Sequence, residues 1–191
     1  TLVSYSMVTQ DMTVFPGMSV QSAVNVADDN TTIKLEPGTF DEGPIEVGAS
    51  INLVGANAGL TGTNAAQRDV ESVLDGIIVQ AGHPVVDGVR INATAGNAVD
   101  VTSSAAGLTL KNSVIAGSNA APSSGVVARH MTELQEVKVS GFAQGVIHRS
   151  GSLTVSNSAL KENTTGLEVA HDGTDSGATL VEACLFENAG G

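Results

Sequence analysis

The chain has 191 residues with a formal charge of −12, and it combines 22 glycines with only 3 % aromatic residues. This length supports one sizeable domain. So acidic a chain lacks the basic face that binding to nucleic acid or to an anionic membrane surface requires. No apolar run reaches the length of a transmembrane helix, so we expect no membrane insertion. With so few aromatic residues, small aliphatic side chains must fill the interior.

The first 30 residues are expected to form an extension or strand followed by one short helix. Residues 18–27 place apolar side chains at helical spacing, and Ser19 is suited to the N-cap position. The sequence Ala-Asp-Asp-Asn that follows ends the pattern. We expect this helix to cap the domain and few or no others to form. The apolar positions are Val20, Ala23, Val24 and Ala27.

From residue 31 to residue 191 the apolar pattern changes to short strands with a period of two. Segments such as TIKLEPGTF, SINLVG, GVRIN, LTLKNSVI and LTVSNSALKEN are each bounded by Gly, Asn, Asp or Ser. Residues 51–63 (INLVGANAGLTGT) are typical, since a strand passes into small polar residues with little to bury. Residues 31–191 are therefore predicted to be the β part of a single domain.

The strands repeat at intervals of 20 to 25 residues. Aligning residues 153–166 with residues 178–191 places equivalent positions 25 apart, and earlier units follow at steps of 21 and 24. The alignment predicts that Val155, Leu160, Leu180 and Leu185 all point inward. It also matches Asn163 with Asn188, which form either an amide ladder or ordinary turns. Cys184, the single cysteine, is expected to be a small buried apolar residue.

Units of this size cannot bury a face alone, so they must stack, each strand pairing with its counterpart one unit away. This predicts an all-β parallel β-helix solenoid, with Gly and Asn at the corners between strands. A leucine-rich repeat would need helical segments, and an antiparallel sandwich would need hairpin dipeptides such as Asn-Gly. Right-handed coiling is expected from the usual hand of parallel crossovers.

The N-terminal half resembles the pectin lyase-like superfamily of right-handed parallel β-helices. The resemblance covers residues 19–91 through SVQSAVNVADDNTTIKLEPGTF, INLVGANAGL, ESVLDGIIV and VVDGVRI. It implies a helix-capped first coil and explains the acidic RDVESVLDG segment as a connection between coils. The superfamily includes lyases, hydrolases, esterases and epimerases as well as bacterial surface domains and phage spikes, so the resemblance implies a fold more than an activity.

One outward column of basic residues is the candidate ligand-binding site. Arg129 and Arg149 are equivalent in the alignment, and His130 and His171 lie one position further on. Two stacked arginines would repel unless an acid or an anionic ligand lay between them. The column is either an anionic-sugar platform or two arginines that are solvated or paired with local acids such as Glu133.

Other polar residues give weaker signals. His148 falls at an inward position and is expected to be a hydrogen-bonded interior or corner residue. Asp172 and Asp175 lie in a glycine-rich segment that has some calcium-loop character, but it lacks the further ligands of an EF-hand loop, and a surface Asx turn is the favoured interpretation. The carboxylates do not assemble into an acid–base pair, and no catalytic, metal or cofactor motif is present.

These patterns favour a non-enzymatic structural or adhesive module on a cell or virion surface. We expect it to contact glycans or neighbouring subunits, as a homo-oligomer or with other structural subunits, at an open C-terminal coil whose strand edges invite association. The alternative is a polysaccharide lyase or hydrolase acting on an acidic polysaccharide. No cofactor is expected, and an extracellular, cell-surface or virion location follows from either interpretation.

Overall fold

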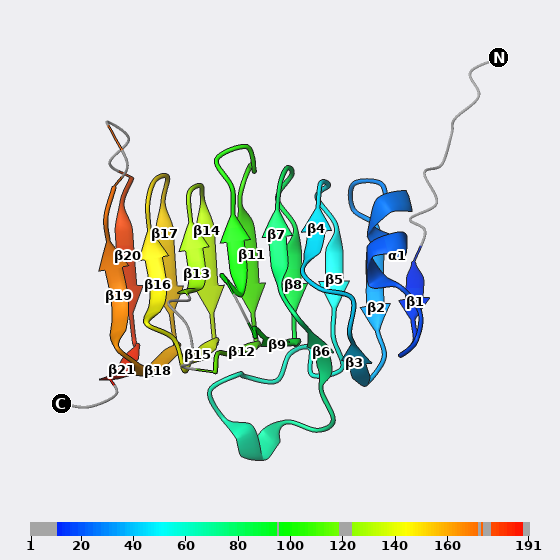
Figure 1. Ribbon diagram of the computed structural model, residues 1–191, viewed down its shortest axis with the longest axis horizontal. Helices are drawn as coiled ribbons and strands as arrows, with labels where there is room; N and C mark the ends of the chain where they lie inside the picture. The colour runs from blue at the N-terminus through cyan, green and yellow to red at the C-terminus, as the bar shows by residue number, and fades with distance from the viewer. Residues whose placement is uncertain (1–10, 95, 119–123, 172, 174–176, 189–191) are drawn as a thin grey trace.

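The computed structural model describes residues 11–94, 96–118, 124–171, 173 and 177–188. It is a parallel β-solenoid of about seven turns built from three sheets. Every strand pair in the described chain is parallel, and each pair joins strands on successive turns, as the repeats predict. Figure 1 shows the strands stacked along the long axis, with the N-terminal helix at one end and β20 and β21 at the other.

Sheets A, B and C form the three walls of the solenoid. Sheet A contains β1 (Met12–Val14), β2 (Thr32–Leu35), β5 (Asn52–Val54), β8 (Val85–Asp87), β11 (Leu108–Lys111), β14 (Thr132–Gln135), β17 (Leu153–Ser156) and β20 (Thr179–Glu182). Sheet B contains β3 (Gly38–Phe40), β6 (Ser72–Leu74), β9 (Arg90–Asn92), β12 (Val114–Ala116), β15 (Lys138–Ser140), β18 (Ala159–Asn163) and β21 (Leu185–Asn188). Sheet C contains β4 (Ile45–Val47), β7 (Ile77–Val79), β10 (Val99–Val101), β13 (Ser124–Ala128), β16 (Gln144–His148) and β19 (Thr165–Val169).

The core consists of columns of aliphatic side chains that run through successive turns. Because successive side chains of a strand point to opposite faces, alternate residues of each strand, one or two per strand, line the interior. Each turn stacks its side chains on those of the turn before, which explains how so few aromatic residues suffice. One column of sheet A contains the fully buried residues Ile33, Leu53, Val86, Leu110, Leu134 and Val155.

The corner between sheets A and B is a two-residue turn in most coils, and its first residue has a positive φ angle. Asn112 (φ 52°) and Asn157 (φ 47°) confirm the predicted use of asparagine, which tolerates this conformation better than most side chains. The next residue in both turns is a buried serine. Ser113 and Ser158 accept hydrogen bonds from backbone N–H groups one turn earlier, at 3.3 and 3.1 Å.

The predicted N-terminal helix is present as α1 (Val20–Val26), and Ser19 is its N-cap, accepting from the Ser22 N–H. Val20 and Val24 are buried in the core, and Ala23 and Ala27 pack against it. The Gln21 side chain also pairs with the backbone of Glu46 in β4, accepting from its N–H (2.7 Å) and donating to its carbonyl (3.0 Å). This amide therefore takes the place of a neighbouring strand at the end of sheet C.

The predicted inward set is wrong in the last turn. Val155 and Leu160 are fully buried, but Leu180 and Leu185 are 48 % and 46 % exposed. The register pairs Val155 with Val181 and Leu160 with Phe186, one residue later than expected. The error arose because the alignment was anchored on the Glu-Asn dipeptides at 162–163 and 187–188. A β-bulge between Lys161 and Asn163 absorbs one residue there, so the spacing of 25 holds after the bulge and not before it.

Asn163 and Asn188 do occupy equivalent positions. The Asn163 side chain, however, bonds to the backbone of the preceding turn: it accepts from the Phe142 N–H (3.1 Å) and donates to the Val139 carbonyl (3.0 Å). It is fully buried, so it is an internal backbone-binding residue. Cys184 is partly buried against the core, in keeping with the prediction of a small apolar residue.

The predicted extension at residues 1–10 lies outside the described residues. Within the described chain, no helix is long and apolar enough to cross a bilayer.

Candidate functional site

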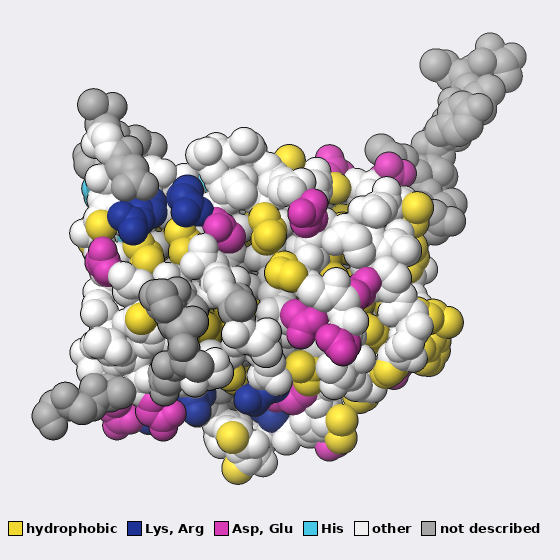
Figure 2. All heavy atoms as spheres, in the orientation of Figure 1, with side chains coloured by type: hydrophobic (Ala, Val, Ile, Leu, Met, Phe, Trp, Pro, Cys, Tyr) yellow, Lys and Arg dark blue, Asp and Glu magenta, His cyan; other side chains and the backbone are white. Residues whose placement is uncertain are grey.

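The predicted basic column lies where sheet C turns into sheet A. Ala128 of β13 pairs with His148 of β16, which places Arg129 and Arg149 on neighbouring turns immediately after these strands. Their backbones continue the ladder, since the Arg149 N–H donates to the Ala128 carbonyl (2.8 Å). In Figure 2, basic side chains gather near the upper ends of β13 and β16, beside an acidic one. The sequence alignment of the two arginines is thus confirmed.

Arg129 is paired with Asp100, which projects outward from β10 on the preceding turn. Its Nη1 forms an ion pair with Asp100 Oδ1, and Asn97 donates a second hydrogen bond to the same carboxylate at 3.1 Å. The acid that neutralises Arg129 is therefore Asp100 of the preceding turn, and not Glu133, the local acid that the sequence suggested as an example. A carboxylate from an adjacent turn could not be identified from sequence separation. It lowers the repulsion between the stacked arginines.

The Arg149 guanidinium is partly buried, and its Nη1 donates to the Ala170 carbonyl at 3.4 Å. On the same corner, the Ser150 hydroxyl donates to the Arg129 carbonyl at 2.6 Å. Side chains of this corner therefore bond to the backbone of neighbouring turns, which fixes the path of the chain between the sheets.

The histidines of the column are placed differently from one another. His130 is exposed, whereas His171 packs its ring edge-on against the buried His148, with centroids 4.9 Å apart. His148 donates from Nε2 to the Gly151 carbonyl (2.9 Å), and its Nδ1 shares a hydrogen bond with the Thr179 hydroxyl (2.7 Å). This confirms His148 as a satisfied interior residue. Within the described chain, the buried Nε2 of His171 has no hydrogen-bond partner.

The structure thus brings Arg129, Arg149 and Asp100 together on the outer side, and places His171 beside the interior. Asp172 and Asp175 lie outside the described residues. Among the residues that are described, no three His, Cys, Asp or Glu side chains lie close enough to hold a metal ion.

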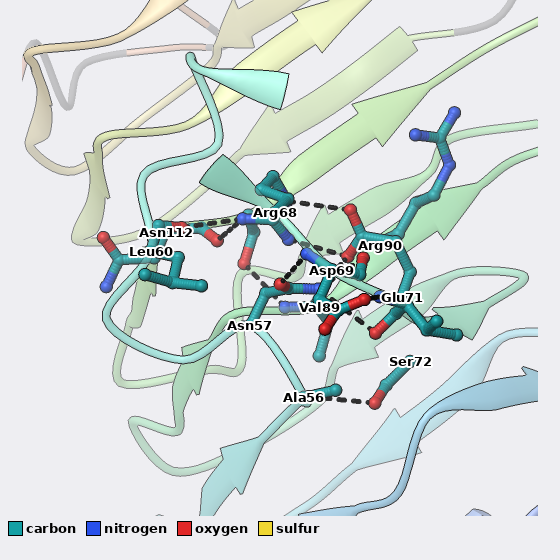
Figure 3. Close-up of polar contacts among 12 residues, drawn as sticks. Ala56, Asn57, Leu60, Arg68, Asp69, Glu71, Ser72, Val89, Arg90 and Asn112 are labelled. Atoms are coloured by element: carbon teal, nitrogen blue, oxygen red, sulfur yellow. Dashed lines mark hydrogen bonds and ion pairs between the residues drawn. The ribbon is translucent and has the colours of Figure 1, made fainter. Parts of the chain in front are cut away.

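A second polar cluster was not predicted. It lies in the long excursion at residues 55–71, between β5 and β6, which includes a short 3₁₀ helix (Ala65–Gln67) and descends below the stack in Figure 1. Its centre is Arg68, whose side chain is only 3 % exposed. Figure 3 shows Arg68 between Glu71 of the same excursion and Asn112 of a later turn.

All three nitrogens of the Arg68 guanidinium donate hydrogen bonds. Nε and Nη2 donate to the two Glu71 oxygens, each at 2.8 Å, and Nη1 donates to the carbonyls of Leu60 (2.7 Å) and Asn112 (2.6 Å). Asn57, fully buried, adds a hydrogen bond to Glu71 and accepts from the Asp69 N–H. The acidic RDVESVLDG segment is therefore a structural connection, as the resemblance implies.

The excursion also forms one wall of a groove on the outer face of sheet B. The opposite side carries Arg90, Val114 and Lys138, which occupy one column on three successive turns. The alignment of Ile115 with Val139 already placed Val114 and Lys138 at equivalent positions. The wall could not be foreseen, because it depends on how the excursion folds back on later turns.

No family model matches this sequence, and the comparisons with curated proteins and with solved structures gave no match either. The structure therefore shows the fold of this chain, a parallel β-solenoid with an N-terminal helix, and not its family.

Proposed function

We propose that this chain is a non-enzymatic structural or adhesive module of a cell or virion surface, which contacts glycans or neighbouring subunits. The observation that carries the proposal is that polar side chains of the Arg129–Arg149 corner are bonded to other groups of the same chain. Arg129 pairs with Asp100, Ser150 with the backbone of the previous turn, and His148 with Gly151 and Thr179. Groups so engaged hold the corner in place, as a rigid contact surface requires.

Contact with an anionic glycan is supported by the outward position of Arg129 and Arg149. The two residues follow paired strands on neighbouring turns, and such strands are about 4.8 Å apart. An acidic sugar polymer running along the solenoid would meet both. Because the pair is partly exposed and Asp100 offsets part of its charge, binding should be modest and weakened by salt.

Contact with a neighbouring subunit is supported by the last described turn. Val181 and Phe186 continue the interior columns yet are 37 % and 43 % exposed, and Leu180 and Leu185 lie beside them. Apolar side chains at this density favour burial against another folded surface. Within the described chain, β20 and β21 each pair on one side only, so backbone hydrogen bonds are available as well.

The alternative function is a lyase or hydrolase acting on acidic polysaccharide. One observation favours it: a carboxylate, Asp100, lies against a guanidinium, Arg129, on the outer side of sheet C. The resemblance of residues 19–91 to the pectin lyase-like superfamily, which includes such enzymes, points the same way. Acid–base cleavage of a glycosidic bond, however, uses a pair of carboxyl groups across the bond, and Asp100 is committed to Arg129 and Asn97.

The test is to incubate the purified chain, with and without calcium, with pectate, with alginate and with a host surface polysaccharide. The proposal predicts retention of a polysaccharide that is weakened, and not abolished, by either Arg129→Ala or Arg149→Ala. It also predicts no unsaturated uronates and no new reducing ends. Products that form with the wild-type chain and are lost in Arg129→Ala or Arg149→Ala would overturn the proposal of a non-enzymatic module and support the lyase or hydrolase.

A further inference from the structure

The groove between the excursion and the outer face of sheet B concentrates positive charge on an acidic protein. It has a volume of about 250 Å³. Three of the eight basic residues of the chain line it, together with two acids. The lining residues are Gly62, Ala65, Arg68, Asp69, Glu71, Arg90, Val114 and Lys138.

The three cations differ in what they bond to. Arg68 is neutralised by Glu71 in a bidentate ion pair, so it belongs to the wall. Arg90 donates from Nε to Asn92 Oδ1 at 2.8 Å, which orients the guanidinium and leaves its two Nη groups without a partner in the described chain. The Lys138 ammonium likewise has no ion-pair or hydrogen-bond partner there. Two cations are thus available to a ligand.

The geometry of the groove is held from both sides. On the sheet side, Arg90 and Lys138 are two strands apart, about 10 Å along the stack, and Val114 lies between them. On the other side, Arg68 bonds the excursion to Asn112 of a later turn, and its bond to Leu60 holds the excursion together internally.

A second contact joins the excursion to a later turn of the solenoid. The Gly62 N–H donates to the Glu136 carbonyl at 2.8 Å. A Cβ at Gly62 would overlap the Ser113 carbonyl, so only glycine allows this close approach. A wall fixed in this way loses little conformational freedom when a ligand binds.

We propose that this groove binds an anionic group, a carboxylate, sulfate or phosphate, carried by a small molecule or by one residue of a glycan. The guanidinium of Arg90 suits bidentate recognition of such oxygens, and Lys138 supplies a point charge. A volume of about 250 Å³ corresponds to about eight waters, which fits one such group with one ring at most. This site lies on a different sheet from the Arg129–Arg149 column and does not depend on the function proposed above.

Asp69 opposes the anion and provides an internal check. Its carboxylate lies in the groove lining, is exposed, and accepts from the Val70 N–H at 2.8 Å. Removing its charge should therefore strengthen anion binding, whereas removing the charge of Arg90 or Lys138 should weaken it. A surface that attracted anions only through the overall field would respond little to the choice among these positions.

The experiment is an NMR titration of the ¹⁵N-labelled chain at low ionic strength, where charge interactions reach furthest. The probes are inorganic sulfate, inorganic phosphate and glucuronate, with glucose as the uncharged match for glucuronate. We expect saturable shifts of the Gly62, Val114 and Lys138 amides with at least one anion and none with glucose. The anion that saturates at the lowest concentration identifies the group that the groove prefers.

Variants decide whether the cations of the groove cause the binding. Arg90→Gln and Lys138→Gln should each weaken it about tenfold or more, as loss of a charge-assisted hydrogen bond predicts, and Asp69→Asn should strengthen it. The matched control is Lys161→Gln, on β18 of the same sheet, where the ammonium is already paired with Glu187 at 2.9 Å. The proposal is overturned if no probe saturates, or if Arg90→Gln and Lys138→Gln both bind like the wild type.

Discussion

Replacing Val155 by aspartate tests the stacking of the interior columns. Val155 is fully buried between Leu134 and Val181 of the neighbouring turns. Losing the burial of a valine side chain costs about 1.5–3 kcal/mol. A carboxyl group without a partner in this apolar column costs about 1–3 kcal/mol more, even when it takes up a proton. The expected loss of about 2.5–6 kcal/mol is a large part of the stability of many domains, about 5–15 kcal/mol.

The matched control for this substitution is Val181→Asp. Val181 is the same residue type in the same column one turn later, but it is 37 % exposed, so a carboxylate there reaches water. We expect it to cost no more than about 2 kcal/mol, the partial loss of one valine's burial. The difference between the two variants isolates the effect of the covered interior from that of residue type.

The assay is urea unfolding monitored by circular dichroism, with amide hydrogen exchange of the folded variant. Stability in stacked repeats is largely a nearest-neighbour property. Exchange in Val155→Asp should therefore accelerate most in β14, β17 and β20, and least in β2 at the far end. Equal unfolding midpoints for Val155→Asp and Val181→Asp, or a Val155→Asp midpoint like that of the wild type, would refute the register.

Three further substitutions test the polar contacts by urea unfolding. Arg68→Gln should cost about 3–5 kcal/mol because it leaves the Glu71 carboxylate, 17 % exposed, without its cation; a loss below 1 kcal/mol would contradict the role of this pair. Asn163→Ala should cost about 2–4 kcal/mol because it leaves one buried N–H and one buried carbonyl unpaired, and an unchanged midpoint would show that water replaces the amide. Asp100→Asn should cost at most about 1 kcal/mol, since its pair with Arg129 is partly exposed; a much larger loss would mean that Asp100 stabilises the corner far more than its exposure indicates.

The sequence predicted those features that depend on local pattern. Alternation placed Val155 and Leu160 inward, helical spacing found α1, and the N-cap preference of serine found Ser19. The parallel stack followed from repeats that cannot bury a face alone. All of these features depend on residues close together in sequence or one repeat apart, for which the separation in sequence predicts the position in the fold.

Features that depend on irregularity escaped prediction. The bulge at Glu162 changes the repeat spacing by one residue. The sequence alignment did not include it and therefore predicted the wrong face for Leu180 and Leu185. The excursion folds back so that Arg68 reaches Asn112, 44 residues later, and no repeat encodes that contact. In the candidate column, the alignment of Arg129 with Arg149 was correct, but the acid that pairs with Arg129 is Asp100, which lies on the preceding turn.

The proposed function is tested most directly by following one sample by NMR while it binds an acidic oligosaccharide. The ¹⁵N-labelled chain is mixed with oligogalacturonate, and the protein amides and the sugar signals are recorded together over a day. The account predicts saturable shifts at the Arg129–Arg149 corner, weakened by added salt, with the sugar spectrum unchanged. New signals of unsaturated or shortened sugars, absent when Arg129→Ala or Arg149→Ala is used, would contradict it.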